Sequence, residues 1–284
     1  MTQDNNIDAF VNEYWPEPKI MLNDNAQVKS HLAFLKNKYG RKTMREYERI
    51  AKRLLTYGDH DSSQKLTDFA FKSGMCEEMA PQTTLRGRLT LYALLTQLSQ
   101  RNTPYTLADF GSGCGRMAAG LAGFLDNLET LYAIEILSSG LNRMKKHIDE
   151  LPPAMKERAK KRIIPIQADY RTEDIKNTVN KADVVLGAYP LYDYTKTINF
   201  FFPFLKPDGE MILCYPHPAP GFLRPAYYED CVLEMHERSY NEAGEKYGLK
   251  FDDISILNFL PEEVIVISTG RFAKEVADAA AKLP

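Results

Sequence analysis

The sequence has few cysteines and no long hydrophobic run. Its four cysteines, at positions 76, 114, 214 and 231, form no C-x-x-C pair, and the histidine spacing matches no zinc site. No segment approaches the roughly 20 apolar residues that a membrane-spanning helix needs, and the polar first ten residues lack the apolar core of a signal peptide. We therefore expect reduced, mostly buried thiols, no metal, no membrane contact and a cytoplasmic location.

A large excess of charge of either sign is also absent. Lysine and arginine total 36 and the acidic residues total 38, which gives a formal net charge of -2. General nucleic-acid binding depends on a basic surface that neutralises phosphates, so we expect no nucleic-acid partner. The 284 residues suffice for one well-buried domain together with an extension.

Hydrophobic periodicity divides the chain into two parts. Residues 1–103 show helical spacing and no clear strand. Over residues 104–284 short apolar runs alternate with helical patterns, which is typical of a parallel sheet with helices on both faces. The runs lie at 105–110, 130–135, 162–167, 182–188 and 209–215. Two further strand-like runs, at 249–258 and 263–270, predict a closing antiparallel hairpin.

A glycine-rich segment, DFGSGCG at 109–115, lies where the first predicted strand turns into a helix. Glycines there allow a tight turn and a close approach of the backbone to a ligand. Two acids end the next two predicted strands. Glu135 can accept both hydroxyls of a ribose, and Asp169 can accept from an adenine amino group. Because Arg116 replaces the last glycine of the dinucleotide pattern G-x-G-x-x-G, a ligand without phosphates is favoured.

With these motifs the chain resembles the class I S-adenosylmethionine-dependent methyltransferases over about residues 104–271. The resemblance rests on DFGSGCG, the two acids, ADVVLGAY at 182–189 and LKPDGE at 205–210. It implies an α/β fold with a Rossmann-like, mostly parallel seven-stranded sheet, helices on both faces and a C-terminal antiparallel hairpin. The N-terminal extension at 1–103 would act as a lid.

The resemblance also implies S-adenosylmethionine as the cofactor. Asp109 would face its methionine part, Glu135 its ribose, and Asp169 its adenine. The residues expected to bind the cofactor are Asp109, Gly111, Ser112, Gly113, Gly115, Glu135, Ile136, Asp169, Tyr170 and Ala188.

The acceptor of the transferred group is expected at the ends of the fourth and fifth predicted strands. Tyr189 and Tyr192 follow the fourth strand, where ring faces can attract a sulfonium or a cationic amine. His217 follows the fifth strand and is a candidate general base, because the ordinary imidazole pKa lies near neutrality. An insertion at 216–240, rich in proline and tyrosine, would shape the substrate site. Rings that pack the sheet end and an ordinary loop histidine are the alternative interpretations.

The function expected from this pattern is methylation of an oxygen or nitrogen of a small molecule, because the extension and the insertion can enclose a pocket. One alternative consumes the same cofactor without methyl transfer. The reactions in this class are aminopropyl transfer, aminocarboxypropyl transfer, and cyclisation to azetidine-2-carboxylate with release of methylthioadenosine. Methylation of a protein and non-catalytic binding of the cofactor are further alternatives. The pattern carries no signal for an oligomeric state.

Overall fold

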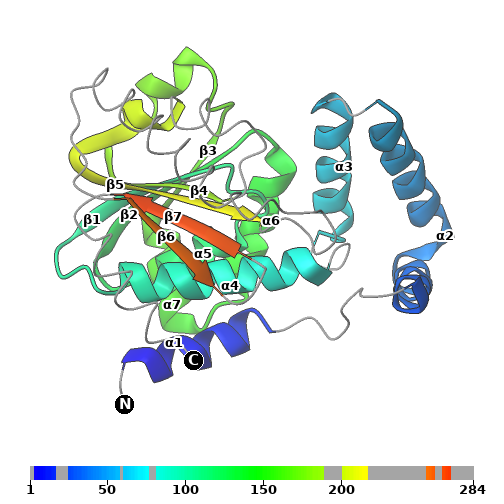
Figure 1. Ribbon diagram of the computed structural model, residues 1–284, viewed down its shortest axis with the longest axis horizontal. Coiled ribbons are helices and arrows are strands. Elements are labelled where there is room, and N and C mark those ends of the chain that lie inside the picture. The colour runs from blue at the N-terminus through cyan, green and yellow to red at the C-terminus, as the bar shows by residue number, and fades with distance from the viewer. Residues whose placement is uncertain are drawn as a thin grey trace.

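The computed structural model of the protein describes residues 3–16, 25–57, 60–76, 81–188, 200–216, 254–259 and 264–269. Within these residues the centre of the molecule is a seven-stranded sheet with the order β3-β2-β1-β4-β5-β7-β6 (Figure 1). The strands are β1 (Tyr105–Phe110), β2 (Leu128–Glu135), β3 (Ile163–Gln167), β4 (Ala182–Ala188), β5 (Leu205–Pro216), β6 (Ile254–Phe259) and β7 (Val264–Thr269).

Most of the sheet is parallel. β1 pairs in parallel with β2 and β4, β2 with β3, and β4 with β5, whereas β7 runs antiparallel to both β5 and β6. The chain moves outward from β1 through β2 to β3 and then returns to β4 on the other side of β1. Open parallel sheets bind ligands at such a reversal, outside the carboxyl ends of the strands. The predicted α/β class with a mostly parallel sheet is confirmed.

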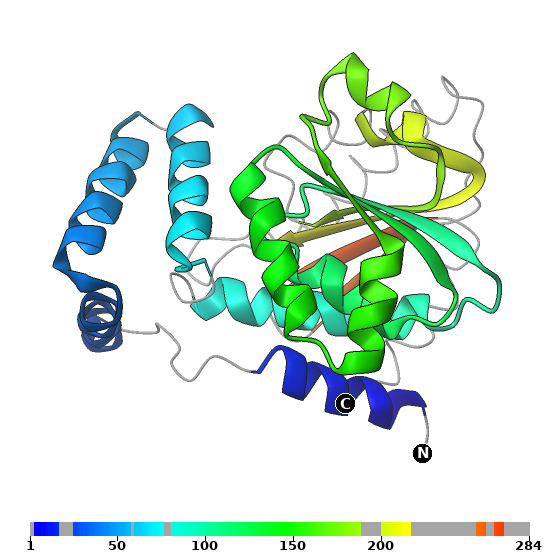
Figure 2. The same ribbon diagram turned by 180° about the vertical axis from the view of Figure 1, so that it is seen from behind.

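One face of the sheet is covered by α-helices (Figure 2). Completely buried alanines of α5, including Ala118 and Ala122, bring this helix close to the strands. Because α5 begins directly after the glycine segment, its packing fixes where that segment lies. The helices on this face are α5 (Arg116–Phe124), α6 (Ser138–Asp149), α7 (Pro153–Arg162), α1 (Gln3–Tyr14) and α4 (Pro81–Leu98).

The opposite face is covered by short helical segments and aromatic side chains. Among the described residues, the segments over it include two short 3-10 helices, η1 (Glu173–Asn177) and η2 (Phe202–Phe204), the second of which directly follows two α-helical residues, Phe200 and Phe201. The rings of Phe201 and Phe204 lie 4.7 and 4.9 Å from that of Phe110, measured between centroids. Aromatic rings bury a large apolar area with few residues, so a short segment suffices to cover the strands.

Two N-terminal helices stand beside the sheet, at one edge of the molecule (Figures 1 and 2). α2 (Asn25–Tyr57) is bent at Gly40, which has a φ of 82°, and packs against α3 (His60–Ser73). Their shared core is small and separate, and α3 also contacts α6. The buried members of this α2–α3 core are Leu35, Met44 and Met75. No helix in the described ranges combines the length and apolarity that crossing a membrane requires. The boundary after residue 103 stays a prediction.

Candidate functional site

The loop between β1 and α5 depends on three glycines in the left-handed region. Gly111, Gly113 and Gly115 have φ angles of 76°, 58° and 70°, which other residues adopt only with strain. A Cβ atom on Gly115 would lie 2.4 Å from Cβ of Met144 in α6, whereas a Cβ atom on Gly111 would meet no atom within 4 Å. Gly115 therefore permits close packing of α5 and α6, and Gly111 borders open space.

The backbone N–H groups of this loop are engaged inside the protein. Those of Gly111 and Ser112 donate to one carbonyl of β2 at 2.9 and 3.0 Å, and that of Gly115 donates to the Ser112 carbonyl at 2.9 Å. The N–H group of Gly113 donates to Oε2 of Glu135 at 2.8 Å. These four groups are therefore not donors for a phosphate, which a dinucleotide-binding loop would offer at this place.

Asp109 lies at the base of the loop and is 1% exposed. Its Oδ1 atom is buried and has no hydrogen-bond partner in the part of the chain that the structure describes. Burial raises the pKa of this carboxyl group to about 7, and the nearby Glu135 carboxylate adds to the rise, while a hydrogen bond with Ser112 opposes it. An unsatisfied buried carboxylate oxygen is costly, so a cation or a hydrogen-bond donor would be stabilised here.

Glu135 closes the same edge of the sheet from the end of β2. Its Oε1 accepts from the N–H group of Leu137 at 2.9 Å, and its Oε2 accepts from Gly113. Burial raises the pKa of Glu135 despite these bonds. Each carboxylate oxygen keeps a second lone pair for a ligand hydroxyl. The next residue, Ile136, is 37% exposed and carries an apolar side chain at the end of the same strand.

Beyond β3, the predicted site residues already have partners. Oδ1 of Asp169 accepts from the backbone N–H and from Nε of Arg171 at 3.0 and 2.7 Å, and Oδ2 pairs with the same guanidinium group. The ring of Tyr170 packs edge-on against Phe110, with centroids 5.9 Å apart. The adenine-binding roles of Asp169 and Tyr170 stay predictions, because a ligand would have to share the carboxylate with Arg171.

Where the acceptor of the methyl group is expected, the structure describes only the ends of β4 and β5. Ala188 ends β4, beside Cys214 of β5, at the carboxyl edge of the sheet that also carries Asp109. The predicted residues Tyr189, Tyr192 and His217 lie outside the described residues, as does the insertion beyond residue 216.

A contact that sequence reasoning missed joins α3 to the glycine loop. Cζ of Phe71 would lie 3.7 Å from a Cβ atom on Gly113, and Oδ1 of Asp68 accepts a hydrogen bond from Ser139 of α6 at 2.6 Å. Positions so far apart in the chain leave no local pattern that would reveal the contact.

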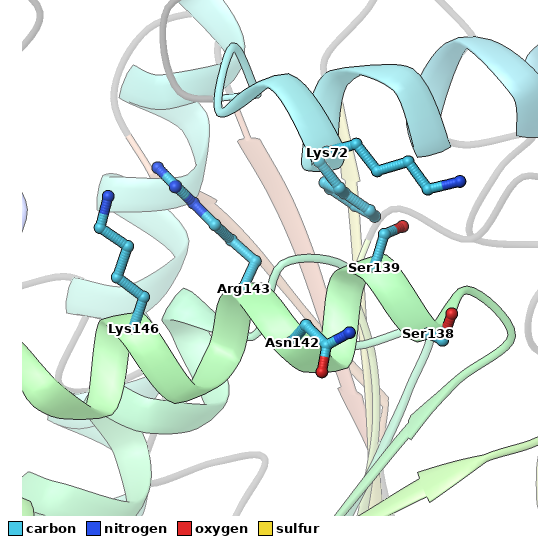
Figure 3. A pocket seen from close by; sticks show the side chains of 7 residues that line it. Lys72, Ser138, Ser139, Asn142, Arg143 and Lys146 are labelled. Atoms are coloured by element: carbon cyan, nitrogen blue, oxygen red, sulfur yellow. The ribbon is translucent and has the colours of Figure 1, made fainter.

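Between α3 and α6 lies a pocket of about 300 Å³, which borders the loop through Phe71 (Figure 3). Arg143 and Lys146 extend from the same side of α6, and Lys72 of α3 pairs with Asp68 at 2.6 Å. The lining is therefore basic, whereas two acids, Asp109 of β1 and Glu135 of β2, flank the loop. The lining residues are Phe71, Lys72, Ser138, Ser139, Asn142, Arg143 and Lys146.

No protein-family model matches this sequence, and no curated protein matches it at a significant level. Several solved structures resemble part of it. The ribosomal protein L11 methylase of Lactobacillus delbrueckii subsp. bulgaricus is 16% identical over 66% of this chain and 79% of its own, with a TM-score of 0.45. TYW2 of M. jannaschii in complex with AdoMet is 19% identical over 66% of this chain and 74% of its own, also with a TM-score of 0.45. Likenesses at this level assign neither an activity nor a ligand to this chain.

Proposed function

We propose that this chain is an S-adenosylmethionine-dependent methyltransferase that acts on an oxygen or nitrogen of a small molecule in the cytoplasm. The observation that carries the proposal is the pair of buried acids at the carboxyl edge of the sheet. Oδ1 of Asp109 is unsatisfied there, and the Glu135 carboxylate raises the pKa of Asp109. Two carboxylates this close together produce a negative potential that favours a cationic ligand. S-adenosylmethionine carries positive charge on its sulfonium and ammonium groups.

The hydrogen bonds that the loop N–H groups already make within the protein also favour S-adenosylmethionine over a nicotinamide or flavin dinucleotide. A pyrophosphate is bound by free N–H groups at a helix N-terminus, but four N–H groups of this loop donate to protein oxygens. S-adenosylmethionine has no phosphate and does not require those donors. The residues present therefore fit this cofactor.

The proposal gives each predicted site residue a role. When bound, the cofactor supplies a methyl group already activated by the positively charged sulfur. Asp109 would accept hydrogen bonds from its methionine part, Glu135 would accept from the ribose hydroxyls, and Ile136 would pack against the purine. The acceptor would enter where β4 and β5 end. Tyr189 and His217, which follow these strands in the sequence, are the residues proposed to act there, and His217 would remove a proton where the acceptor requires it. The balanced charge of the chain supports a small acceptor without a nucleic-acid or membrane partner.

The ribose assignment is tested by calorimetric titration of Glu135→Ala with S-adenosylmethionine. Loss of charged hydrogen bonds should weaken binding by about 1 to 3 kcal/mol. Glu129→Ala, an exposed position on the same strand, is the matched control and should bind like wild type. Because Glu135 also holds the loop through Gly113, circular dichroism must first show that the variant is folded. Equal affinities of the folded variants would remove Glu135 from the cofactor site.

The reaction itself is tested by mass spectrometry of the cofactor products, with purified protein alone and with a metabolite extract. S-adenosylhomocysteine that forms only with extract establishes methyl transfer, and the methylated product then identifies the acceptor. Methylthioadenosine in place of S-adenosylhomocysteine would show that the cofactor is cleaved on the other side of the sulfur and that the methyltransferase assignment is wrong.

A further inference from the structure

Two cysteines from separate parts of the chain meet beside the glycine loop, and a histidine lies near one of them. Cys114 lies within the loop, Cys76 follows α3, and His147 lies on α6. The Cys114 thiol is in hydrogen-bonding contact with the Cys76 thiol, and the His147 ring is near enough to act on it electrostatically. Neither cysteine is in a disulfide, and both are only partly buried. Two reduced thiols thus face each other across the junction between α3 and the loop.

Packing holds this junction in place. Met75, next to Cys76, is completely buried in the α2–α3 core, and its N–H group donates to the Ala70 carbonyl at 3.0 Å. The contact of Phe71 with Gly113 and the hydrogen bond between Asp68 and Ser139 fix the adjacent turns of α3. The packing of α3 against the glycine loop and α6 therefore holds the two thiols near each other.

The surroundings of Cys114 favour its thiolate, which is the reactive form of cysteine. The pKa of Cys114 is held well below its usual range, first by the hydrogen bond with Cys76 and then by His147, although burial opposes the shift. The completely buried His147 places its Nδ1 atom 3.0 Å from Oε2 of Glu150, which orients the ring. Cys214 differs, because burial raises the pKa of its thiol.

We propose that Cys76 and Cys114 form a reversible intramolecular disulfide that joins α3 to the glycine loop. A low-pKa, accessible cysteine beside a second thiol is the arrangement found in redox-sensing pairs. The described residues contain no group of three metal-ligating side chains that would use these thiols instead. Neither partner was predicted to do more than remain a buried, reduced thiol.

With a peroxide as oxidant the chemistry balances. The Cys114 thiolate attacks one peroxide oxygen, the O–O bond breaks, and a sulfenic acid and hydroxide form. The Cys76 sulfur then attacks the Cys114 sulfur, and the S–O bond breaks to release water. Two thiols are oxidised to one disulfide, and the peroxide is reduced to two water molecules. A thiol reductant reverses the change through a mixed disulfide.

Disulfide formation alters the loop, and its effect on the cofactor rests on the proposed function. An S–S bond of about 2.0 Å is shorter than a hydrogen-bonding contact, so the loop or the end of α3 must move. Cys114 directly follows Gly113, whose N–H group holds Glu135. The oxidised protein should therefore bind S-adenosylmethionine more weakly than the reduced protein.

The disulfide is tested on the full chain without cofactor. The protein is treated with hydrogen peroxide in the presence of a chelator, alkylated with iodoacetamide, and mapped by mass spectrometry after proteolysis. The expected result is a Cys76–Cys114 cross-linked peptide that dithiothreitol removes. Cys76→Ser should accumulate a dimedone-reactive sulfenic acid at Cys114, and Cys214→Ser should still form the link. Free alkylated Cys114 after oxidation, or a link from Cys114 to Cys231, would overturn the proposal.

The effect on the cofactor site is measured separately by calorimetric titration with S-adenosylmethionine. Oxidation should weaken binding by wild type at least about tenfold, equivalent to 1.4 kcal/mol, and should leave binding by Cys76→Ser unchanged. Equal affinities of oxidised and reduced wild type would overturn control of the site by the disulfide. If instead the proposed function is wrong, the result is different, because the reduced protein would then not bind S-adenosylmethionine at all.

Discussion

At the scale of single residues, Asp109 makes stability depend on pH. Its pKa in the folded protein is about 7, above the ordinary value of about 3.9, so the folded state binds the proton more tightly than the unfolded state. Its contribution to stability is complete below about pH 4 and is lost as the pH rises through 7. Glu135, whose pKa is also raised, acts in the same direction.

Asp109→Asn should remove most of this dependence. Between pH 5 and pH 8 the free energy of unfolding of wild type should fall relative to that of the variant by about 2 to 3 kcal/mol. Urea unfolding of both proteins at the two pH values measures the difference. A constant difference would mean that the Asp109 carboxyl group is ionised across the whole range.

The loop glycines allow a matched comparison of two substitutions. Gly111→Ala and Gly115→Ala both force alanine into the left-handed region, which costs about 1 to 2 kcal/mol. Only at Gly115 does the new Cβ atom meet another atom closely, at 2.4 Å from Cβ of Met144. Overpacking should add about 1 to 3 kcal/mol there. Denaturant unfolding should rank Gly115→Ala as the less stable variant, whereas Gly111→Ala should chiefly weaken cofactor binding. Equal stabilities would contradict the packing role of Gly115.

Site residues that are close together in the sequence, or that end neighbouring strands, could be predicted. Contacts that depend on how distant segments pack could not. Asp109 and the glycines are contiguous, so one strand-to-helix turn brings them together. Glu135 follows from the end of the neighbouring strand. Cys76 and Cys114 come from segments whose contact depends on how α3 docks, and no spacing rule encodes that docking. The pairing of Asp169 with Arg171 involves near neighbours, but the sequence does not show that the guanidinium group folds back onto the carboxylate.

At the scale of elements, a buried ion pair fastens α4 to β5. Nη2 of Arg101, just beyond α4, lies 2.8 Å from Oε2 of Glu210, and Gln97 bonds the other carboxylate oxygen. Both members of the ion pair are buried. Removal of one partner leaves an uncompensated buried charge, so Arg101→Met should lower the free energy of unfolding by about 3 to 5 kcal/mol.

Thermal and chemical unfolding measure that loss, and a double variant isolates its cause. Arg101→Met combined with Glu210→Met replaces both charges by apolar groups and should be more stable than Arg101→Met alone. Glu46→Gln, which breaks the exposed pair with Arg49, should change stability little. A double variant less stable than the single one would mean that Glu210 contributes through contacts other than this pair.

Strands were easier to predict than the segments between them. β1 and β4 are nearly continuous apolar runs, because both of their faces are buried. The connection from β3 to β4 is different, since it covers the second face of the sheet with Ile175 of the short 3-10 helix η1 and with Tyr170, which precedes that helix. Apolar spacing alone does not distinguish such a segment from an α-helix, because a few large side chains cover the same area.

At the scale of the whole molecule, the helices before β1 belong to two separate cores. α1 and α4 share the large core on the helical face of the sheet, whereas α2 and α3 enclose a small one. Stability is expected to follow this division, because a unit with few buried apolar residues opens locally at low free energy. Amides of α2 and α3 should thus exchange with solvent faster than those of β1 and β4.

Two core substitutions test whether the two cores unfold independently. Leu35 and Leu94 are both buried, in the small and the large core respectively, and each change to alanine should cost about 2 to 5 kcal/mol within its own unit. Hydrogen exchange read by mass spectrometry should show Leu35→Ala speeding exchange in α2 and α3 alone, and Leu94→Ala speeding it throughout the sheet. If Leu35→Ala also speeds exchange in β1, the two cores unfold together. The α2–α3 pair would then be a fixed part of the molecule and would open only when the whole protein unfolds.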